Sequence, residues 1–258
     1  MEKKAILVDI KRCVGCQSCE QACQRVHGFP EQHQAHLSDT ALTVVEQHGE
    51  KFVRRMCLHC EDPACASACL VGALKKSSFG PVTYDAKKCM GCRYCMIACP
   101  QAVPKYEWSK LAPYVKKCDM CAERQAAGEK PACVEACPLD ASTVGNREDI
   151  LKEAWSRVRS DSSYVPRVYG VEEFGGTSVF YISDVAFEEL GFVKPALGSQ
   201  PLPTLSAAAL GETPTVVLVG GSMLAALYWI TQRRRDVALA ESHTAQPKQT
   251  EKIDEGRS

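Results

Sequence analysis

The sequence has no net charge and none of the short motifs that identify the common enzyme classes. Its 31 Lys and Arg are balanced by 31 Asp and Glu, which removes the global electrostatic case for nucleic-acid binding. It contains no Gly-rich phosphate loop before a helix, no nucleophile elbow and no recognisable pair of catalytic acids. We therefore expect the function to depend on something other than a side-chain active site.

Cysteine is absent from the whole chain after Cys137, although the chain has 16 cysteines. All of them lie between Cys13 and Cys137, so we expect them to serve one role. The first ten residues carry charges around the short apolar run 5–8, and they offer no segment of the kind that is cleaved from secreted proteins. A secreted domain stabilised by disulfides, which the even number first suggests, is therefore not expected.

The cysteines form four quartets with closely related spacing. The first and third read C-x2-C-x2-C-x3-C, the second is stretched by two residues, and the fourth contains an eleven-residue loop. The quartets are Cys13, Cys16, Cys19 and Cys23; Cys57, Cys60, Cys65 and Cys69; Cys89, Cys92, Cys95 and Cys99; and Cys118, Cys121, Cys133 and Cys137. This is the bacterial ferredoxin run, in which three thiolates bind one iron–sulfur cluster and the fourth binds another.

A single quartet cannot complete its own cluster. Thiolates two residues apart on a tight loop reach neighbouring irons, whereas we expect the last cysteine to begin a helix that points elsewhere, with Pro100 or Pro138 at the helix start. Quartets must therefore pair, and two pairs give four clusters that use every thiolate. Spacing alone leaves the pairing open, consecutive pairing included, and leaves a structural zinc site as an alternative for the fourth quartet.

Several side chains near the quartets could adjust a cluster. His59 lies between Cys57 and Cys60, and we expect it to donate a hydrogen bond near the cluster or to pack there, not to bind iron. Nearby cations raise the reduction potential of an anionic cluster. The basic residues close to the quartets could have this role, or they could be solvated surface residues. The basic residues close to the quartets are Lys11, Arg12, Lys87, Lys88, Arg93, Lys116 and Lys117.

The segments around the quartets predict hairpins, a helix and a strand. Residues 42–45 and 52–55 flank a turn at 48–49, and residues 73–76 and 82–85 flank 77–81. Asn146 is a candidate N-cap for a helix over 147–159, and 177–183 predicts a buried strand. The apolar stripe of that helix consists of Ile150, Leu151, Ala154, Trp155 and Val158. We expect a cluster region over 1–145 and a segment packed on it over 146–193.

An uncharged run near the C-terminus predicts one transmembrane helix. Residues 213–232 carry no charge, and at ~1.5 Å per residue they span ~30 Å, the thickness of the hydrocarbon core. Pro214 would stand at the helix start, with Tyr228 and Trp229 at headgroup depth; a buried core helix is the alternative. Residues 194–212 predict a linker and 233–258 a polar, disordered tail.

Three arginines follow the predicted span directly. Arg233, Arg234 and Arg235 stand on its C-terminal side, whereas the fifteen residues before the span contain no Lys or Arg. Because positive residues collect on the cytoplasmic side of membranes, we expect a cytoplasmic C-terminus. The cysteine-rich region is then expected on the outer, periplasmic face.

Five segments carry a resemblance to a known family: DIKRCVGCQSCEQAC, CLHCEDPACASAC, YDAKKCMGCRYCMIACP, KCDMCAERQAAGEKPACVEACP and VYGVEEFGGTSVFYISD. The chain resembles the four-cluster ferredoxin-type iron–sulfur (beta) subunits of membrane-bound molybdopterin oxidoreductases. It resembles most the beta subunit of respiratory formate dehydrogenase and the related hydrogenase electron-transfer subunit. The resemblance covers about residues 4–193, and the single C-terminal helix is similar too.

The resemblance implies that the first quartet pairs with the fourth and the second with the third. Carried over by position, the ligand sets are Cys13, Cys16, Cys19 and Cys137; Cys118, Cys121, Cys133 and Cys23; Cys57, Cys60, Cys65 and Cys99; and Cys89, Cys92, Cys95 and Cys69. Cys23 and Cys69 are followed by Gln24 and Leu70 and not by proline, which puts the local helix starts in question but not the ligands.

The resemblance also implies an α+β fold of two pseudo-symmetric dicluster ferredoxin-like modules with one C-terminal transmembrane helix. It implies four [4Fe-4S] clusters and export in the folded state with a partner that carries a twin-arginine signal. We expect a non-catalytic electron-transfer subunit between a molybdenum or tungsten pterin catalytic subunit, of formate dehydrogenase type, and a membrane cytochrome b or quinone site. The alternatives are the equivalent subunit of a nickel–iron hydrogenase or of a terminal reductase, and, from another class, a zinc-stabilised membrane adaptor.

Overall fold

The computed structural model describes residues 2–111, 113–195 and 198–244. By its internal contacts the chain divides into two units, Met1–Thr204 and Leu205–Ser258. The first unit contains every cysteine, and the second contains most of one long helix. The fold is α+β, as the resemblance implies.

A three-stranded sheet is the centre of the first unit. Its strands lie in the order β8 (Ser142–Asn146), β1 (Lys4–Asp9) and β9 (Val179–Ile182), with β1 antiparallel to β8 and parallel to β9. Strand β1 is almost continuously apolar and buried, which is typical of a central strand covered on both faces. The two ends of the cysteine-rich region are therefore held together by one sheet.

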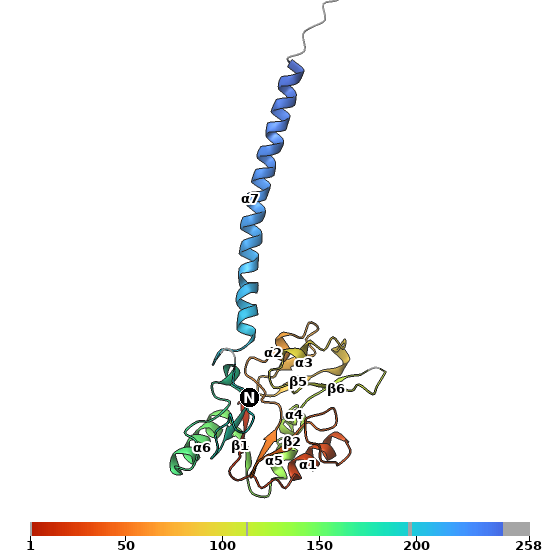
Figure 1. Cartoon of the computed structure of the whole chain (residues 1–258). Helices are drawn as coiled ribbons and strands as arrows, with labels where there is room; N and C mark the ends of the chain where they lie inside the picture. Colours follow the sequence, from red (N-terminus) through yellow and green to blue (C-terminus); the bar gives the residue numbers. More distant parts are fainter. Residues whose placement is uncertain (1, 112, 196–197, 245–258) are drawn as a thin grey trace, which may run out of the picture. The chain divides into compact units, whose positions relative to one another are not determined.

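Helix α6 (Arg147–Ser160) covers one face of this sheet (Figure 1). Its buried residues Ile150, Ala154 and Val158 pack against apolar side chains of β1 and β9, so the predicted helix, its apolar stripe and the buried strand are confirmed. Asn146 is the N-cap residue, as predicted, but its side chain makes no capping hydrogen bond and instead accepts one from Lys4 Nζ at 2.7 Å.

Three antiparallel hairpins surround the sheet. Strand β2 (Val44–His48) pairs with β3 (Lys51–Arg55), β4 (Leu74–Lys76) with β5 (Val82–Tyr84), and β6 (Lys105–Tyr106) with β7 (Val115–Lys116). The first two are the hairpins that the sequence predicts. The first unit also contains two 3-10 turns, η1 (Ala86–Lys88) and η2 (Glu173–Gly175).

Short helices carry the cysteine quartets in two groups. Helices α1 (Ser18–His27), α4 (Ala122–Ala126) and α5 (Ala132–Glu135) lie together near β2, whereas α2 (Ala64–Ser67) and α3 (Tyr94–Ala98) lie together near β5 and β6 (Figure 1). Helix α1 packs against α5, and α2 packs against α3. The first and fourth quartets therefore form one module and the second and third form the other.

The five short helices begin before the last cysteine of their quartets, whereas the sequence predicts that a helix begins at that cysteine. Helices α2, α3 and α5 begin just before the third cysteine of a quartet and end before the fourth, so Cys99 is the C-terminal cap of α3 and not the start of a helix. Pro100 and Pro138 follow helix ends, where proline prevents continuation. Helix α1, whose Cys23 is followed by Gln24, continues beyond its last cysteine to His27.

Helix α7 (Pro203–Thr244) is longer than predicted. It begins inside the predicted linker, continues into the predicted tail and contains Pro214 in its interior. Alanine-rich flanks with high helix propensity explain both extensions. The rest of that tail, 245–258, lies outside the described residues.

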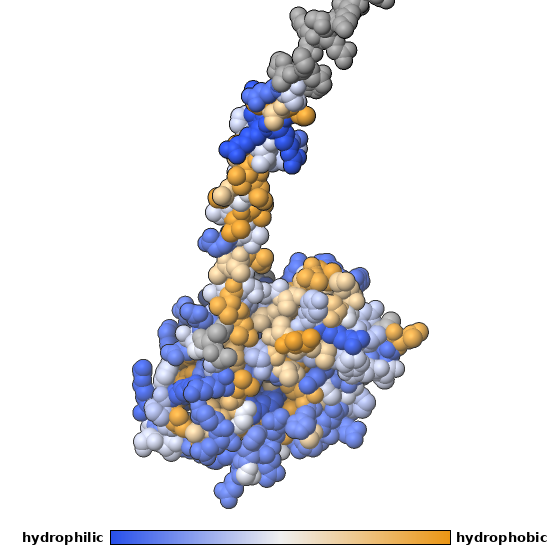
Figure 2. Space-filling view, turned by 45° about the horizontal axis from the view of Figure 1, so that its top comes forward, coloured by the Kyte–Doolittle hydropathy of each residue, from blue (hydrophilic) through white to orange (hydrophobic). Residues whose placement is uncertain are grey.

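Residues Pro203–Ser242 of α7 form a helix long and apolar enough to cross a membrane. Its apolar and charged stretches are the orange and blue parts of α7 in Figure 2. The side chains of its apolar window are exposed, which does not fit the alternative of a buried core helix.

Candidate iron–sulfur sites

All four quartets use the same backbone turn. The residue before the second cysteine is left-handed in each: Gly15 (φ 70°), His59 (φ 50°), Gly91 (φ 74°) and Met120 (φ 59°). Left-handed residues in tight loops turn backbone N–H groups towards a bound anion, as at many iron–sulfur sites. The Gly15 N–H donates to the Cys13 sulfur, and the Met120 N–H donates to Cys118 Sγ at 3.3 Å.

Four sets of cysteines, each of three from one quartet and one from another, come together. Site A is Cys13, Cys16, Cys19 and Cys137; site B is Cys23, Cys118, Cys121 and Cys133; site C is Cys57, Cys60, Cys65 and Cys99; site D is Cys69, Cys89, Cys92 and Cys95. The four thiols of A line one pocket, and those of C line another. Two of the four sets, one in each module, thus surround a pocket.

The thiols grouped as sites B and D interact electrostatically with one another. In D, Cys95 interacts with Cys89, Cys92 and Cys69. In B, Cys23 interacts with Cys133 and Cys121, and Cys118 interacts with Cys23 and Cys133. The same four groupings are implied by the family resemblance.

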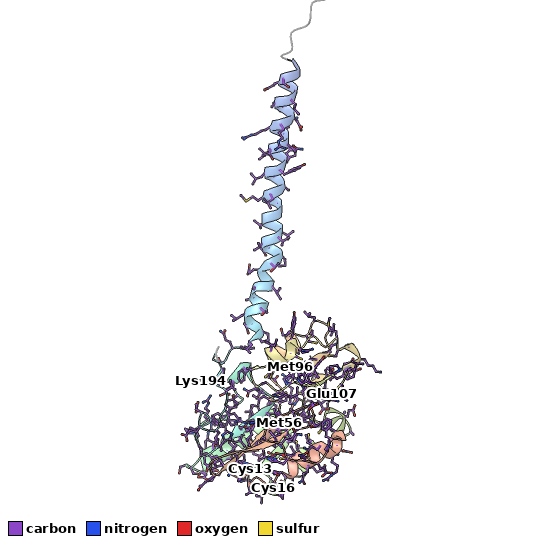
Figure 3. All side chains as sticks on the ribbon, turned by 45° about the vertical axis from the view of Figure 1, so that its right-hand side comes forward. Cys13, Cys16, Met56, Met96, Glu107 and Lys194 are labelled. Carbon is purple, nitrogen blue, oxygen red and sulfur yellow. The ribbon has the colours of Figure 1, made fainter. Side chains whose placement is uncertain are left out.

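The four sites follow one another in the order A, B, C, D. Cys19 of A interacts with Cys133 of B, and Cys118 of B interacts with Cys57 of C. Cys65 of C interacts with Cys95 of D. Figure 3 shows Cys13 and Cys16 in one part of the first unit, Met96, beside Cys95 of D in the sequence, in another, and Met56 between them. The sites form a continuous series through the first unit.

These thiols are not arranged for a single metal ion or for disulfides. All 16 cysteines are free, and among residues 2–111, 113–195 and 198–244 no three His, Cys, Asp or Glu side chains approach closely enough to hold one ion. A zinc ion would draw four sulfurs to about 2.3 Å from one point. The sequence leaves a structural zinc site as an alternative for the fourth quartet, but this quartet is divided between sites A and B. Four thiols around a larger space fit a cluster with four irons.

Burial disfavours the free thiolates of these sites. It raises the pKa of Cys19 and of Cys65 to about 12, and the pKa of Cys95 and of Cys121 to about 11. The neighbouring thiolates contribute to each of these increases. The positive charge of bound iron supplies the compensation that the surrounding protein lacks.

His59 is fully buried beside site C. Its Nδ1 accepts a hydrogen bond from the Val82 N–H at 2.9 Å, so the proton of the neutral ring is on Nε2, which has no protein partner among the described residues. Burial, together with Lys117 and Lys76, lowers the pKa of His59 well below its ordinary value. His59 is thus a neutral ring with one free donor, which fits the predicted hydrogen-bonding role.

Of the basic residues near the quartets, only Lys117 is buried. It donates to the backbone carbonyls of Val82 and Cys118, at 2.5 and 2.6 Å, and its charge reaches Cys65 and Cys99 of site C. The others lie at the surface or in ion pairs, such as Lys11 with Asp161. The structure adds one cation that sequence reasoning missed, Arg54 of β3, which is 2% exposed and lines the pocket of site A.

Known proteins share both the motif and most of the chain. A family model described as "4Fe-4S dicluster domain" matches residues 49–147. A protein of Nitratidesulfovibrio vulgaris is 39% identical over 259 residues, which is 93% of this chain and 70% of the relative. The hydrogenase-2 operon protein HybA of Escherichia coli O157:H7 is 34% identical over 85% of this chain and 79% of its own length.

A third relative is the iron–sulfur subunit of the nitrate-inducible formate dehydrogenase of Escherichia coli K12, 34% identical over 69% of this chain and 67% of its own length. The chain belongs to the family of iron–sulfur electron-transfer subunits of membrane-bound oxidoreductases. The cofactors of this subunit are four [4Fe-4S] clusters, as expected from its 16 cysteines. Its membership excludes the zinc-stabilised adaptor that the sequence left open.

Proposed function

We propose that this subunit carries single electrons through sites A, B, C and D between a pterin-containing catalytic subunit and a membrane cytochrome b or quinone site. A bound [4Fe-4S] cluster supplies one-electron oxidation and reduction. The observation that carries the proposal is the unbroken order of the four cysteine sets, in which each set has a thiol within electrostatic reach of the next.

Both ends of this series have exposed apolar side chains. Beside site A, Cys16 is exposed, and so are Val14 and Leu139. Beside site D, the exposed side chains are those of Leu70, Met90, Tyr94 and Ile97. Apolar side chains next to a redox site support docking of another subunit there. Two such places, one at each end, support a subunit that receives electrons from one partner and passes them to a second.

We assign the ligands of the four clusters to the cysteine sets of sites A to D. The test counts iron in the purified full chain, which should hold about sixteen irons when four clusters are bound. The double variant Cys13→Ala/Cys137→Ala removes two ligands of site A and should leave about twelve irons. The matched variant Cys89→Ala/Cys137→Ala removes one ligand from each of two sites and should leave about eight. The reverse result would mean that consecutive quartets pair.

The catalytic partner is proposed to be of the formate dehydrogenase type, supported by the relative with that name. A nickel–iron hydrogenase is the second candidate, because the hydrogenase-2 operon protein aligns with 85% of this chain and the formate dehydrogenase subunit with 69%. Purification of the intact complex followed by metal analysis separates them. Molybdenum or tungsten supports the first, and nickel without either supports the second.

Helix α7 is proposed to anchor the subunit with a cytoplasmic C-terminus and the cluster region outside. The three arginines from Arg233 to Arg235 support this orientation. Proteolysis of sealed spheroplasts tests it, since the cluster region should be accessible from outside while a C-terminal tag stays protected. Protection of the cluster region in intact spheroplasts, with digestion after lysis, would show the opposite orientation.

A further inference from the structure

Arg54 is a buried cation without a carboxylate partner. Its side chain is 2% exposed, and no carboxylate of the described residues lies within ion-pair distance of it. One terminal nitrogen is 3.4 Å from the Cys133 carbonyl oxygen, the other is 3.2 Å from Met56 Sδ, and Nε has no hydrogen-bond partner among the residues that the structure describes. Among the described residues, every other buried charged side chain has a polar partner: Asp9, Glu107 and Glu173 pair with Arg or Lys, Glu20 lies beside His33, and Lys117 donates to close carbonyls.

A guanidinium in this position stays charged and needs an anion. An isolated cation in dry protein is costly, and an arginine cannot lose its proton to avoid that cost. The compensating charge must therefore come from what binds at the cysteines around it.

The cysteines that interact most strongly with the Arg54 charge belong to sites A and B. The Arg54 charge interacts with Cys13 and Cys19 of site A. It also interacts with Cys23, Cys118 and Cys133 of site B. Strand β3 places the guanidinium between the two sets, opposite Val45 of β2, which also lines the pocket of site A. Arg54 is therefore shared by two neighbouring sites.

We propose that Arg54 is a positioning charge that sets the reduction potentials of the clusters at sites A and B. Reduction makes a cluster with four thiolates more negative, and a fixed cation in a low-dielectric interior favours that more negative state. Arg54 raises the potentials at A and B relative to those at C and D. The inference rests on the proposed ligand sets and adds a residue outside the quartets to them.

The test is a redox titration of the full chain in detergent, followed by electron paramagnetic resonance. Arg54→Met removes the charge at nearly constant volume. The matched control is Arg55→Met, which removes the same charge from the next residue of β3, where the guanidinium pairs with Glu46 and lies over Phe192. In R54M we expect two of the four signals to become at least tenfold harder to reduce, a shift of about −59 mV for a one-electron couple. In R55M all four stay close to wild type.

Each outcome decides a different point. If R54M holds as much iron as wild type and no potential moves, or all four move equally, the role of Arg54 is wrong. If the wild-type chain holds no iron, the proposed function fails instead. If R54M loses iron, Arg54→Lys decides: retention of iron and potentials in R54K shows that the charge is what sites A and B require. Loss of iron in R54K as well would show that guanidinium shape matters and would overturn the inference.

Discussion

Asp9 should be the carboxylate on which the first unit depends most. It is the last residue of β1, is fully buried and accepts hydrogen bonds from Tyr164 Oη at 2.9 and 3.1 Å. Arg157 of α6 donates to it at 3.1 Å, and Arg12 lies 3.4 Å away. One side chain thus joins the central sheet, helix α6 and the loop that leads to Cys13.

The expected cost of Asp9→Asn follows from these contacts. Removing one partner of a buried ion pair costs about 3–5 kcal/mol. Arg157 keeps Glu153 as a partner and is 16% exposed, which places the expectation at the lower end, about 3 kcal/mol. For a chain of this size about 1 kcal/mol corresponds to about 2–4 °C. The melting temperature should therefore fall by about 6–12 °C.

The assay is thermal unfolding under anaerobic conditions, followed both by far-UV circular dichroism and by the visible absorbance of the clusters. Asp149→Asn on α6 is the control, because Asp149 is 66% exposed in its pair with Lys152. A surface ion pair contributes only about 0–1 kcal/mol to the free energy of unfolding. A D9N shift no larger than that of D149N would refute the reasoning. Because Asp9 fixes the start of the first cysteine loop, cluster absorbance should be lost before helix content in D9N.

Three further predictions follow from the sites. Lys117→Met should lower the potential of the cluster at site C and leave site A unchanged in the same redox titration, and a shift at A would contradict the assignment. Gly91→Ala should destabilise site D and lower iron content, because a Cβ there would lie 2.6 Å from Tyr106 Oη on a backbone with φ +74°. The control is Gly128→Ala, where φ is +82° but the space is open, so the variant should cost only about 1–2 kcal/mol of backbone strain. Anaerobic chelation of iron should abolish cooperative thermal unfolding, and an unchanged transition would show that the clusters do not support the fold.

The sequence was sufficient wherever a short-range pattern determined the result. Alternating and periodic apolar residues predicted both first hairpins, helix α6 and strand β9, and the cysteine spacing predicted the clusters. Helix α7 extends beyond its predicted span because its alanine-rich flanks favour helix in spite of their proline and glycine. A proline after cysteine does not show the direction of a short helix, because it suits both a helix start and the residue beyond a helix end.

Long-range placement could not be read from local patterns. Arg54 and Arg55 are neighbours on one strand, and strand alternation says that they face opposite sides without saying which side is buried. Likewise, Lys116 and Lys117 both precede Cys118, and only the fold shows that the first is partly exposed and pairs with Glu107 while the second enters the interior. Neither distinction depends on residue type, so composition and spacing carry no signal for it.

The cysteines and buried cations together indicate that the clusters are part of the hydrophobic core. The largest core cluster includes Cys23, Cys57, Cys118 and Cys133, and another includes Cys65 and Cys95. Without iron these thiols would surround unfilled space, and loss of packing contacts in a core destabilises a fold. Arg54 and Lys117 would also remain as buried cations without carboxylate partners. Anionic clusters relieve both defects at once, because they fill the space and neutralise the charge. Cluster insertion should therefore complete the folding of the first unit and not merely follow it.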